Sequence, residues 1–273
     1  MSIIGNPLTV GGTGGVDGLN NCLRFSSPSS FTLKVYDGAK HWDGSLEWTD
    51  GVNGWKTWNG TTVLSASEGF LALRGTGNSV ITGGTSADYR WSLTGSDIRC
   101  DGNIETLLDY ATVAAGNHPQ MGAHSFNALF FGCTSLTTAP VLPATTLANY
   151  CYAYMFYGCT SLTTAPALPA TTLAYYCYPY MFSSCTSLTT APALPATTLA
   201  NYCYNSMFSD CTSLRMSQSH EGDYQCAYRI PTTGSGTTAT SALDGMFSGT
   251  GGTFTGTPSI NTTYYTTNPP IAA

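Results

Sequence analysis

The segment Cys133-Thr134-Ser135-Leu136-Thr137-Thr138-Ala139-Pro140 decides the fold, because it recurs at Cys159 and Cys185, and its first four residues recur at Cys211. The interval between successive copies is 26 residues. A fixed period of roughly 20 to 50 residues is typical of stacked supersecondary units, each too small to bury its own apolar face. The sequence therefore predicts a solenoid in which each repeat is covered by its neighbours.

Apolar and aromatic residues keep the same interval, and we expect them to form ladders in the core. The half-repeat that begins at each cysteine is predicted to be a short strand ended by proline, which cannot donate to a ladder. The following segment, around Tyr152, is predicted to return as a short helix or an irregular turn. The predicted interior ladders are Leu136, Leu162, Leu188 and Leu214; Leu142, Leu168 and Leu194; Leu147, Leu173 and Leu199; and Phe156, Phe182 and Phe208.

The predicted fold class is mainly β, with three parts along the chain. Residues 1–20 are glycine-rich and are predicted to be a docking arm, because they have too little side chain to pack alone. Residues 21–100 contain alternating runs separated by Asp-Gly and Asn-Gly turns, which predicts a small antiparallel β domain. Residues 101–273 are predicted to form the solenoid, with a C-terminal cap and an insertion at 216–241 whose polar composition is typical of a loop.

The charge of the chain excludes some classes of partner. Nine Lys and Arg residues face fifteen Asp and Glu residues, and the net charge is -6. Such a chain lacks the cations that drive non-specific binding to nucleic acid. No run approaches the roughly 18 apolar residues of a membrane span, so no membrane insertion is expected. The N-terminus also lacks the charged and apolar segments of a secretory signal.

Acid-base chemistry is excluded from the repeats. Between Asp109 and Asp210 there is no Asp, Glu, Lys or Arg. His118 and His124 are the only groups in that stretch that titrate near neutrality, and neither has an acidic or cysteine partner at ligand spacing. We therefore predict no catalytic residue, no metal site and no cofactor.

Ten cysteines would ordinarily suggest disulfides. Seven of them lie at repeat-equivalent positions, where side chains in register point the same way instead of toward each other. We expect these seven to be free buried thiols that act as small hydrophobic residues. The pattern leaves Cys22, Cys100 and Cys226 undetermined.

Tyrosines supply the predicted binding surface. They form columns along the solenoid, and the residues around them, such as Ala153, Pro179 and Asn205, vary between repeats. Because variable positions are typically exposed, this region is predicted to face a ligand. Alternatively, half of the tyrosines cover the edge of the core and contact no ligand. A third interpretation is that the regular threonine pairs order water as an ice-binding face, although threonine is also the ordinary outward residue of a strand. The predicted ligand-binding residues are Tyr152, Tyr154, Tyr157, Tyr178, Tyr180 and Tyr204.

The repeat Met-Phe-Tyr-Gly-Cys-Thr-Ser-Leu-Thr-Thr-Ala-Pro-Ala-Leu-Pro-Ala-Thr-Thr-Leu-Ala, at residues 155–174, resembles the BspA-like, Treponema-type leucine-rich repeats of gut bacteria and their phages. The resemblance covers about residues 101–260. The run at residues 51–60 is similar to the β domain often found ahead of those repeats. The resemblance implies a surface adhesin or interaction protein. Short members without a secretion signal resemble phage tail proteins, and the family has no catalytic motif.

These observations predict a non-catalytic structural and receptor-binding protein, a phage or prophage tail component located in the virion or outside the cell. Residues 1–100 would contact other virion or tail proteins, and the solenoid would contact a glycan or protein of the host surface; a homo-oligomer is compatible with the sequence. One alternative is an adhesin on a bacterial cell surface. Another is a hydrolase in the β domain built on Asp37, His41, Asp43 and Glu47, although Asp-Gly pairs around an aromatic residue are more often turns.

Overall fold

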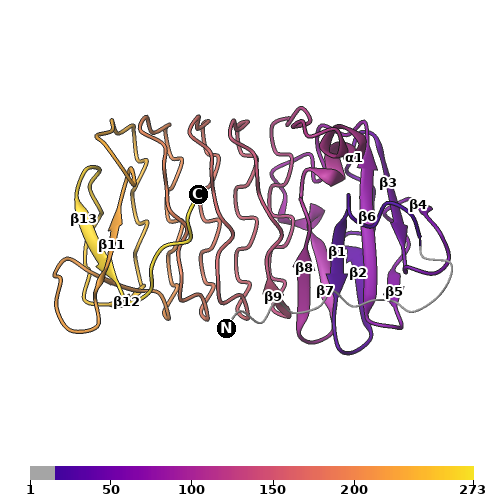
Figure 1. The fold of residues 1–273 in the computed structure, drawn as a ribbon, viewed down its shortest axis with the longest axis horizontal. Coiled ribbons are helices and arrows are strands. Elements are labelled where there is room, and N and C mark those ends of the chain that lie inside the picture. The colour runs from indigo at the N-terminus through magenta and orange to yellow at the C-terminus, as the bar shows by residue number, and fades with distance from the viewer. Residues whose placement is uncertain (1–15) are drawn as a thin grey trace.

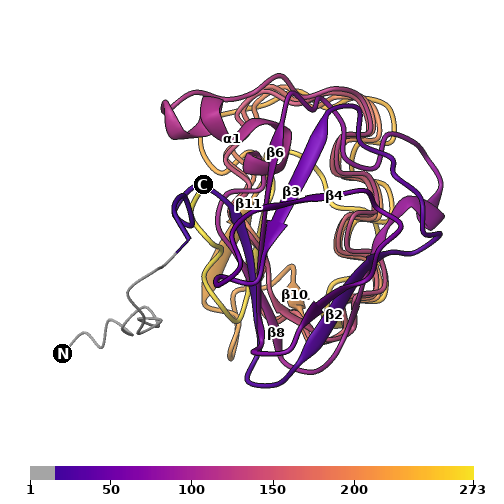
Figure 2. The same cartoon turned by 90° about the vertical axis from the view of Figure 1, so that its right-hand side faces the viewer.

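The computed structural model describes residues 16–273, so the glycine-rich segment of the predicted docking arm lies outside the described residues. Figure 1 shows a molecule with a strand-rich part at one end and a row of stacked coils leading away from it. Figure 2 looks along the row, and the coils nearly superpose in that view. The predicted fold class, mainly β, is confirmed.

The strand-rich part begins at residue 23 and ends with a short helix. A 3-10 turn, η1 (Ala87–Tyr89), and helix α1 (Thr106–Ala114) accompany its strands. The helix is interrupted at Asp109, whose φ of -153° and ψ of 103° are extended. The strands are β1 (Leu23–Ser26), β2 (Phe31–Val35), β3 (Ser45–Thr49), β4 (Lys56–Trp58), β5 (Leu64–Ala66), β6 (Phe70–Thr76), β7 (Trp91–Thr94) and β8 (Ile98–Asp101).

These strands form two sheets. The first has the order β4-β3-β6-β1-β8-β9, and the second has the order β5-β2-β7. All pairs within residues 21–100 are antiparallel. Helix α1 packs on β6, where Gly75 leaves room for the backbone of Leu107.

The first sheet extends past residue 100 into the repeats. Its last strand, β9 (Leu136–Thr138), belongs to the first Cys-Thr-Ser-Leu repeat and pairs in parallel with β8. The N–H of Ile98 donates to the carbonyl of Ser135 at 2.9 Å, and the N–H of Trp91 donates to that of Leu129 at 2.7 Å. One buried apolar cluster runs from Leu23 to Tyr264. The strand-rich part therefore covers the open face of the first coil.

The coils are joined by a regular backbone pattern. The N–H groups of Tyr152 and Tyr154 donate to the carbonyls of Cys177 and Pro179 in the next coil, both at 3.0 Å. Between them the N–H of Ala153 folds back to the carbonyl of Tyr150 at 3.3 Å. Alternate residues thus bond to the next coil and within their own coil, which satisfies the backbone without a helix or strand. We call this surface the turn wall; it consists of residues 124–133, 150–159, 176–185, 202–211 and 241–250.

The predicted interior ladders are buried. Every leucine and phenylalanine in them is at most 8 % exposed except Leu173, which is partly buried. All of the seven repeat cysteines are free and buried, as expected. The Sγ–H of Cys159 donates to the carbonyl of Phe130 at 3.2 Å, and that of Cys185 to Phe156 at 3.0 Å. These two thiols therefore link their coils to the preceding ones.

One expectation about local structure holds only in the first repeat, and the other is decided between its two alternatives. Strand β9 is not repeated in the later half-repeats, which make isolated bridges such as Thr164 with Thr190. The N–H groups of Leu136 and Leu162 close the same turn at 3.1 Å, so the difference lies in the neighbour: β9 pairs with the regular strand β8, whereas the later half-repeats have only one another. The segment after each proline forms turns and no helix, because left-handed residues interrupt it every fourth position.

The predicted insertion at 216–241 is not simply a loop. It includes most of β10 (Arg215–Ser217) and all of β11 (Cys226–Arg229), which join β12 (Gly251–Gly252) and β13 (Thr263–Thr266) in the order β11-β13-β10-β12. Pairing with the C-terminal β13 overrides the polar composition of the segment. Within residues 16–273, no helix has the length and apolar character needed to cross a membrane.

Candidate functional site

The turn wall places a residue in the left-handed region at every fourth position. The φ values of these non-glycine residues lie between 49° and 62°. Bulky residues rarely adopt this conformation, because Cβ approaches the following carbonyl. The first position is occupied by His124, Tyr150, Tyr176, Tyr202 and Ser241; the second by Ala128, Tyr154, Tyr180, Ser206 and Gly245; and the third by Gly132, Gly158, Ser184, Asp210 and Gly249.

Side chains alternate between the inside and the outside of the wall. The tyrosines at the left-handed positions are half-buried, with one side toward solvent. Residues two positions later point into the core, where Tyr152, Tyr178 and Tyr204 are each 1 % exposed. The prediction that these three contact a ligand is therefore wrong, because a packed ladder covers their rings. Tyr154, Tyr157 and Tyr180 remain accessible.

The first-position residues stack into a column along the outside of the wall. Ring centroids lie 4.5 Å apart from His124 to Tyr150, 5.1 Å from Tyr150 to Tyr176 and 4.6 Å from Tyr176 to Tyr202. The edge of Tyr175 meets the rings of Tyr150 and Tyr202 at 5.5 and 6.1 Å. Tyr175 is 40 % exposed and is the most accessible ring of this group.

A second group of rings lies beside the first. Tyr154 stacks on Tyr180 at 4.9 Å, and Phe131 stacks on Tyr157 at 4.7 Å. Tyr154 also approaches Tyr157 at 6.2 Å, which joins the two pairs. Tyr150 and Tyr154 are successive left-handed residues of one coil, and Tyr176 and Tyr180 are those of the next, so the two groups form one surface.

The surface continues onto the strand-rich part through one cation. The guanidinium of Arg90 lies 5.7 Å from the ring centre of Phe131 and 3.4 Å from that of Tyr36. Tyr36 is 47 % exposed. We call the whole surface the aromatic face; it consists of Tyr36, Arg90, His124, Phe131, Tyr150, Tyr154, Tyr157, Tyr175, Tyr176, Tyr180 and Tyr202.

Apart from Arg90, which pairs with Asp88, the aromatic face carries no permanent charge. Desolvation by burial raises the pKa of the Tyr150, Tyr154 and Tyr176 phenols, and neighbouring phenols raise it further. Burial also lowers the pKa of His124. These phenols stay protonated at neutral pH, where each can both donate and accept a hydrogen bond. Because stacked rings cover one another's faces, the column presents ring edges and hydroxyls to a ligand.

The hydrolase alternative placed four residues in one cluster, but the structure gives them separate partners. Nε2 of His41 lies 3.0 and 2.9 Å from the two carboxylate oxygens of Asp37. Asp43 accepts bonds from the N–H and hydroxyl of Ser79. Glu47 pairs with Arg74 at 2.8 Å. The four residues do not converge on a common point.

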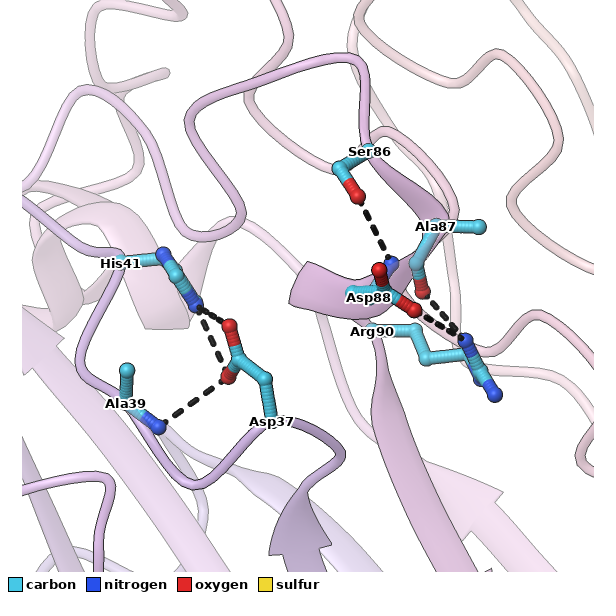
Figure 3. A network of polar contacts seen from close by, with 7 residues as sticks. All are labelled: Asp37, Ala39, His41, Ser86, Ala87, Asp88 and Arg90. Carbon is cyan, nitrogen blue, oxygen red and sulfur yellow. Dashed lines mark hydrogen bonds and ion pairs between the residues drawn. The ribbon is translucent and has the colours of Figure 1, made fainter.

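Figure 3 shows the Asp37 and His41 pair beside a second polar group at η1. There the carboxylate of Asp88 lies 3.6 Å from Nη1 of Arg90, which also donates to the carbonyl of Ala87 at 2.7 Å. The hydroxyl of Ser86 caps η1 by accepting from the N–H of Asp88 at 3.1 Å. These bonds hold Arg90 in position over the ring of Tyr36. Between residues 16 and 273 no three His, Cys, Asp or Glu side chains are grouped to hold a metal.

The two histidines of the repeats have different environments. His124 stacks in the aromatic column, whereas Nδ1 of His118 lies 2.7 Å from Oε2 of Glu105. The expectation that His118 has no acidic partner is therefore wrong. Helix α1 and the loop after it bring His118 back to the carboxylate of Glu105, which lies thirteen residues earlier in the chain.

The predicted ligand-binding residues also left out five rings of the first column and its edge, although its tyrosines lie in the region predicted to face a ligand. The rule that variable positions are exposed fails at Ala153 and Ser183, which are 0 and 3 % exposed, because small residues of several kinds fit the core. A usable signal was the 26-residue interval between His124 and Tyr150. The missed residues are His124, Tyr150, Tyr175, Tyr176 and Tyr202.

No protein-family model matches this chain, and comparisons with curated proteins and with solved structures also find no match.

Proposed function

We propose that this chain is a BspA-like leucine-rich-repeat solenoid protein that acts without catalysis as a structural and receptor-binding component of a phage or prophage tail. The aromatic face binds a neutral glycan of the host surface. The strand-rich part, with the N-terminal segment ahead of it, attaches the protein to other virion proteins. The observation that carries the proposal is the row of outward aromatic rings repeated coil after coil.

The backbone pattern supports the leucine-rich-repeat assignment. In the turn wall, hydrogen bonds join successive coils at equivalent positions, with a longer interval only across the insertion at 216–241, and leucines at the 26-residue interval fill the interior. Each coil is covered by two others, as in solenoids of stacked repeats. The strand-rich part takes the role of a terminal cap through the parallel pairing of β8 with β9.

The chemistry of the aromatic face supports a glycan ligand. Tyrosine offers a large contact area at low side-chain entropy cost, together with a hydroxyl. No Asp, Glu, Lys or Arg occurs between residues 110 and 209, so the coils offer no charge to pair with a charged ligand. Neutral sugars carry hydroxyls and apolar C–H faces, which match phenol hydroxyls and ring edges. A cell-surface adhesin would use the same face. The two functions differ in what the protein is attached to, a tail particle or the bacterial envelope.

A glycan array tests the ligand with three proteins. We expect the wild-type chain to bind a set of neutral glycans, and the triple variant Tyr150→Ser, Tyr176→Ser and Tyr202→Ser to lose that binding. The matched control changes Thr171→Ala and Thr197→Ala, which are exposed in the same coils outside the turn wall. Circular dichroism checks that all three proteins are folded. Retained glycan binding by the tyrosine variant would contradict the proposal. If no glycan binds and a pull-down from host envelope recovers a protein instead, the proposed glycan ligand is wrong.

Attachment is tested with particles. We expect the full chain to co-sediment with tail particles and a chain lacking residues 1–20 to remain in the supernatant. Co-sedimentation unchanged by this deletion would refute attachment through that segment. Display on the bacterial envelope, with no particle association, would favour the adhesin.

A further inference from the structure

The stack of coils opens at one corner. Further along, the corner is closed by hydrogen bonds, such as Leu147 N–H to the Thr172 carbonyl at 3.3 Å and Leu199 N–H to the Thr237 carbonyl at 3.0 Å. Twenty-six residues before Leu147 the chain has Met121, and its N–H makes no such bond. In the described part of the chain, no backbone hydrogen bond joins residues 118–121 to residues 144–148.

A cavity of about 370 Å³ occupies this opening. That volume lies near the lower end of the range for small-molecule sites, roughly 300 to 1,000 Å³. Its apolar walls include Met121 and Leu147, and its polar groups include the hydroxyls of Thr145 and Thr146. We call it the Glu105 pocket, because that residue supplies its carboxylate.

Glu105 is an unusual residue for such a position. Its side chain is 2 % exposed, and its Oε2 lies 2.7 Å from Nδ1 of His118, whose own side chain is 53 % exposed. Burial raises the pKa of the Glu105 carboxyl, whereas the hydrogen bond from His118 acts in the opposite direction. A buried carboxylate is costly unless a cation or several donors compensate it.

The protein supplies no permanent cation for this carboxylate. The repeats contain no Lys or Arg between residues 110 and 209. Among the described residues, the ion pairs of Arg24, Arg74, Arg90 and Arg215 are with other carboxylates. The pocket therefore holds a buried carboxylate whose one charged partner in the part of the protein that the structure describes is the half-exposed His118 imidazole.

We propose that the Glu105 pocket binds a small molecule that carries an ammonium group, with the ammonium donating to the Glu105 carboxylate. The threonine hydroxyls accept hydrogen bonds from its remaining N–H groups or bond to hydroxyls of the ligand, and Met121 and Leu147 contact its carbon skeleton. A metal ion is a poorer match, because the pocket offers one carboxylate and one imidazole. This site is separate from the aromatic face, and the inference goes beyond the proposed function and does not depend on it.

Calorimetric titration of the full chain at pH 7 tests the inference with three probes at equal ionic strength. Glucosamine and methylammonium carry the ammonium with and without a sugar ring, and glucose is the neutral counterpart. We expect glucosamine to bind and glucose to give no heat. Binding of methylammonium as well assigns the recognition to the ammonium alone, and its failure to bind assigns it to an amino sugar.

The matched variants are Glu105→Gln and Glu68→Gln, the latter at an exposed glutamate in the strand-rich part. A hydrogen bond to a charged group predicts a loss of affinity of roughly ten- to hundredfold for Glu105→Gln and no change for Glu68→Gln. Equal affinity in the two variants, glucose binding as tightly as glucosamine, or no binding of either ammonium probe would overturn the proposal.

A second measurement needs no substitution and so remains valid if Glu105→Gln fails to fold. Amide resonances of the unchanged protein are followed during titration with glucosamine. We expect the largest shifts at Gln120, Thr145 and Thr146, which line the pocket. Shifts confined to the aromatic face or to the strand-rich part would overturn the assignment of the site.

Discussion

Phe182→Ala is expected to be among the most damaging substitutions in the repeats. Phe182 is 0 % exposed, and its ring lies 5.6 Å from both Phe156 and Phe208, with interplanar angles of 4°. Each neighbouring ring is held by its own coil and cannot move in to fill the space. Removal of a buried phenylalanine costs about 3 to 5 kcal/mol, and the loss of two ring pairs places this site in the upper half of that range.

The matched control is Tyr180→Ala, two residues earlier on the same coil. Tyr180 is half-buried and stacks on Tyr154 at 4.9 Å, whereas the next coil carries Ser206, which has no ring. One lost ring pair predicts a cost of about 1 kcal/mol. Alanine keeps the left-handed conformation at a comparable penalty, so the backbone contributes little to the difference.

Urea unfolding of both variants, followed by far-ultraviolet circular dichroism, gives the two free energies of unfolding. We expect Phe182→Ala to lose about 4 kcal/mol and Tyr180→Ala about 1 kcal/mol. Similar losses in the two variants would refute the alternation of inward and outward side chains along the turn wall.

Three further predictions use other parts of the molecule. Burial raises the pKa of four ladder thiols to about 12, so at pH 8 a thiol reagent should label the half-buried Cys226 in the native chain and all ten cysteines after denaturation. The raised pKa of Glu105 means that the native state loses this proton at a higher pH than the unfolded state does. The urea midpoint of wild type relative to Glu105→Gln should therefore fall as pH rises from about 4 to 7, and a constant difference would contradict this. In Gly75→Ala the new Cβ would lie 1.6 Å from the Leu107 carbonyl, so thermal unfolding should show a loss of about 3 kcal/mol. Gly77→Ala, with φ of 63° and nothing within 4 Å, should lose only about 1 kcal/mol.

The 26-residue period was enough to predict which leucines and phenylalanines form the core. Equivalent residues of stacked coils must cover one another, whatever the detailed path of the chain. The period also placed the cysteines among the buried residues. It could not show which of two neighbouring aromatic columns faces inward, because Tyr150 and Tyr152 recur with the same interval.

The direction of those columns depends on the sign of φ, which alternates in a pattern of four residues. This pattern has neither the period of a strand nor that of a helix. Gly132 and Gly158 carry a usable signal, because glycine in a turn often marks a positive φ. Counting back four and eight residues from Gly158 reaches Tyr154 and Tyr150, the outward residues of that coil.

The start of the repeats was harder to locate. Coil 124–133 has Phe126 and Leu129 where the next coil has Tyr152 and Met155, and Ser125 replaces the cysteine, so its identity with the repeat is hidden. The boundary expected at residue 100 is crossed by a sheet, since β8 provides the edge on which the first coil pairs. The Glu105 pocket lies at this junction, where the regular pattern that made prediction feasible no longer applies.

The tyrosines at left-handed positions are close to neutral for stability. A left-handed non-glycine residue costs about 1 to 2 kcal/mol, which glycine would avoid. Glycine instead loses about 0.5 to 1 kcal/mol in backbone entropy. Each stacked ring pair gains about 0.5 to 1.5 kcal/mol, so the contributions cancel to within about 1 kcal/mol. The third left-handed position of the same wall has glycine, serine or aspartate and builds the same turns without rings. Stability therefore gives no reason for tyrosine at the first two positions, and a ligand that contacts the outward ring edges and hydroxyls would give one.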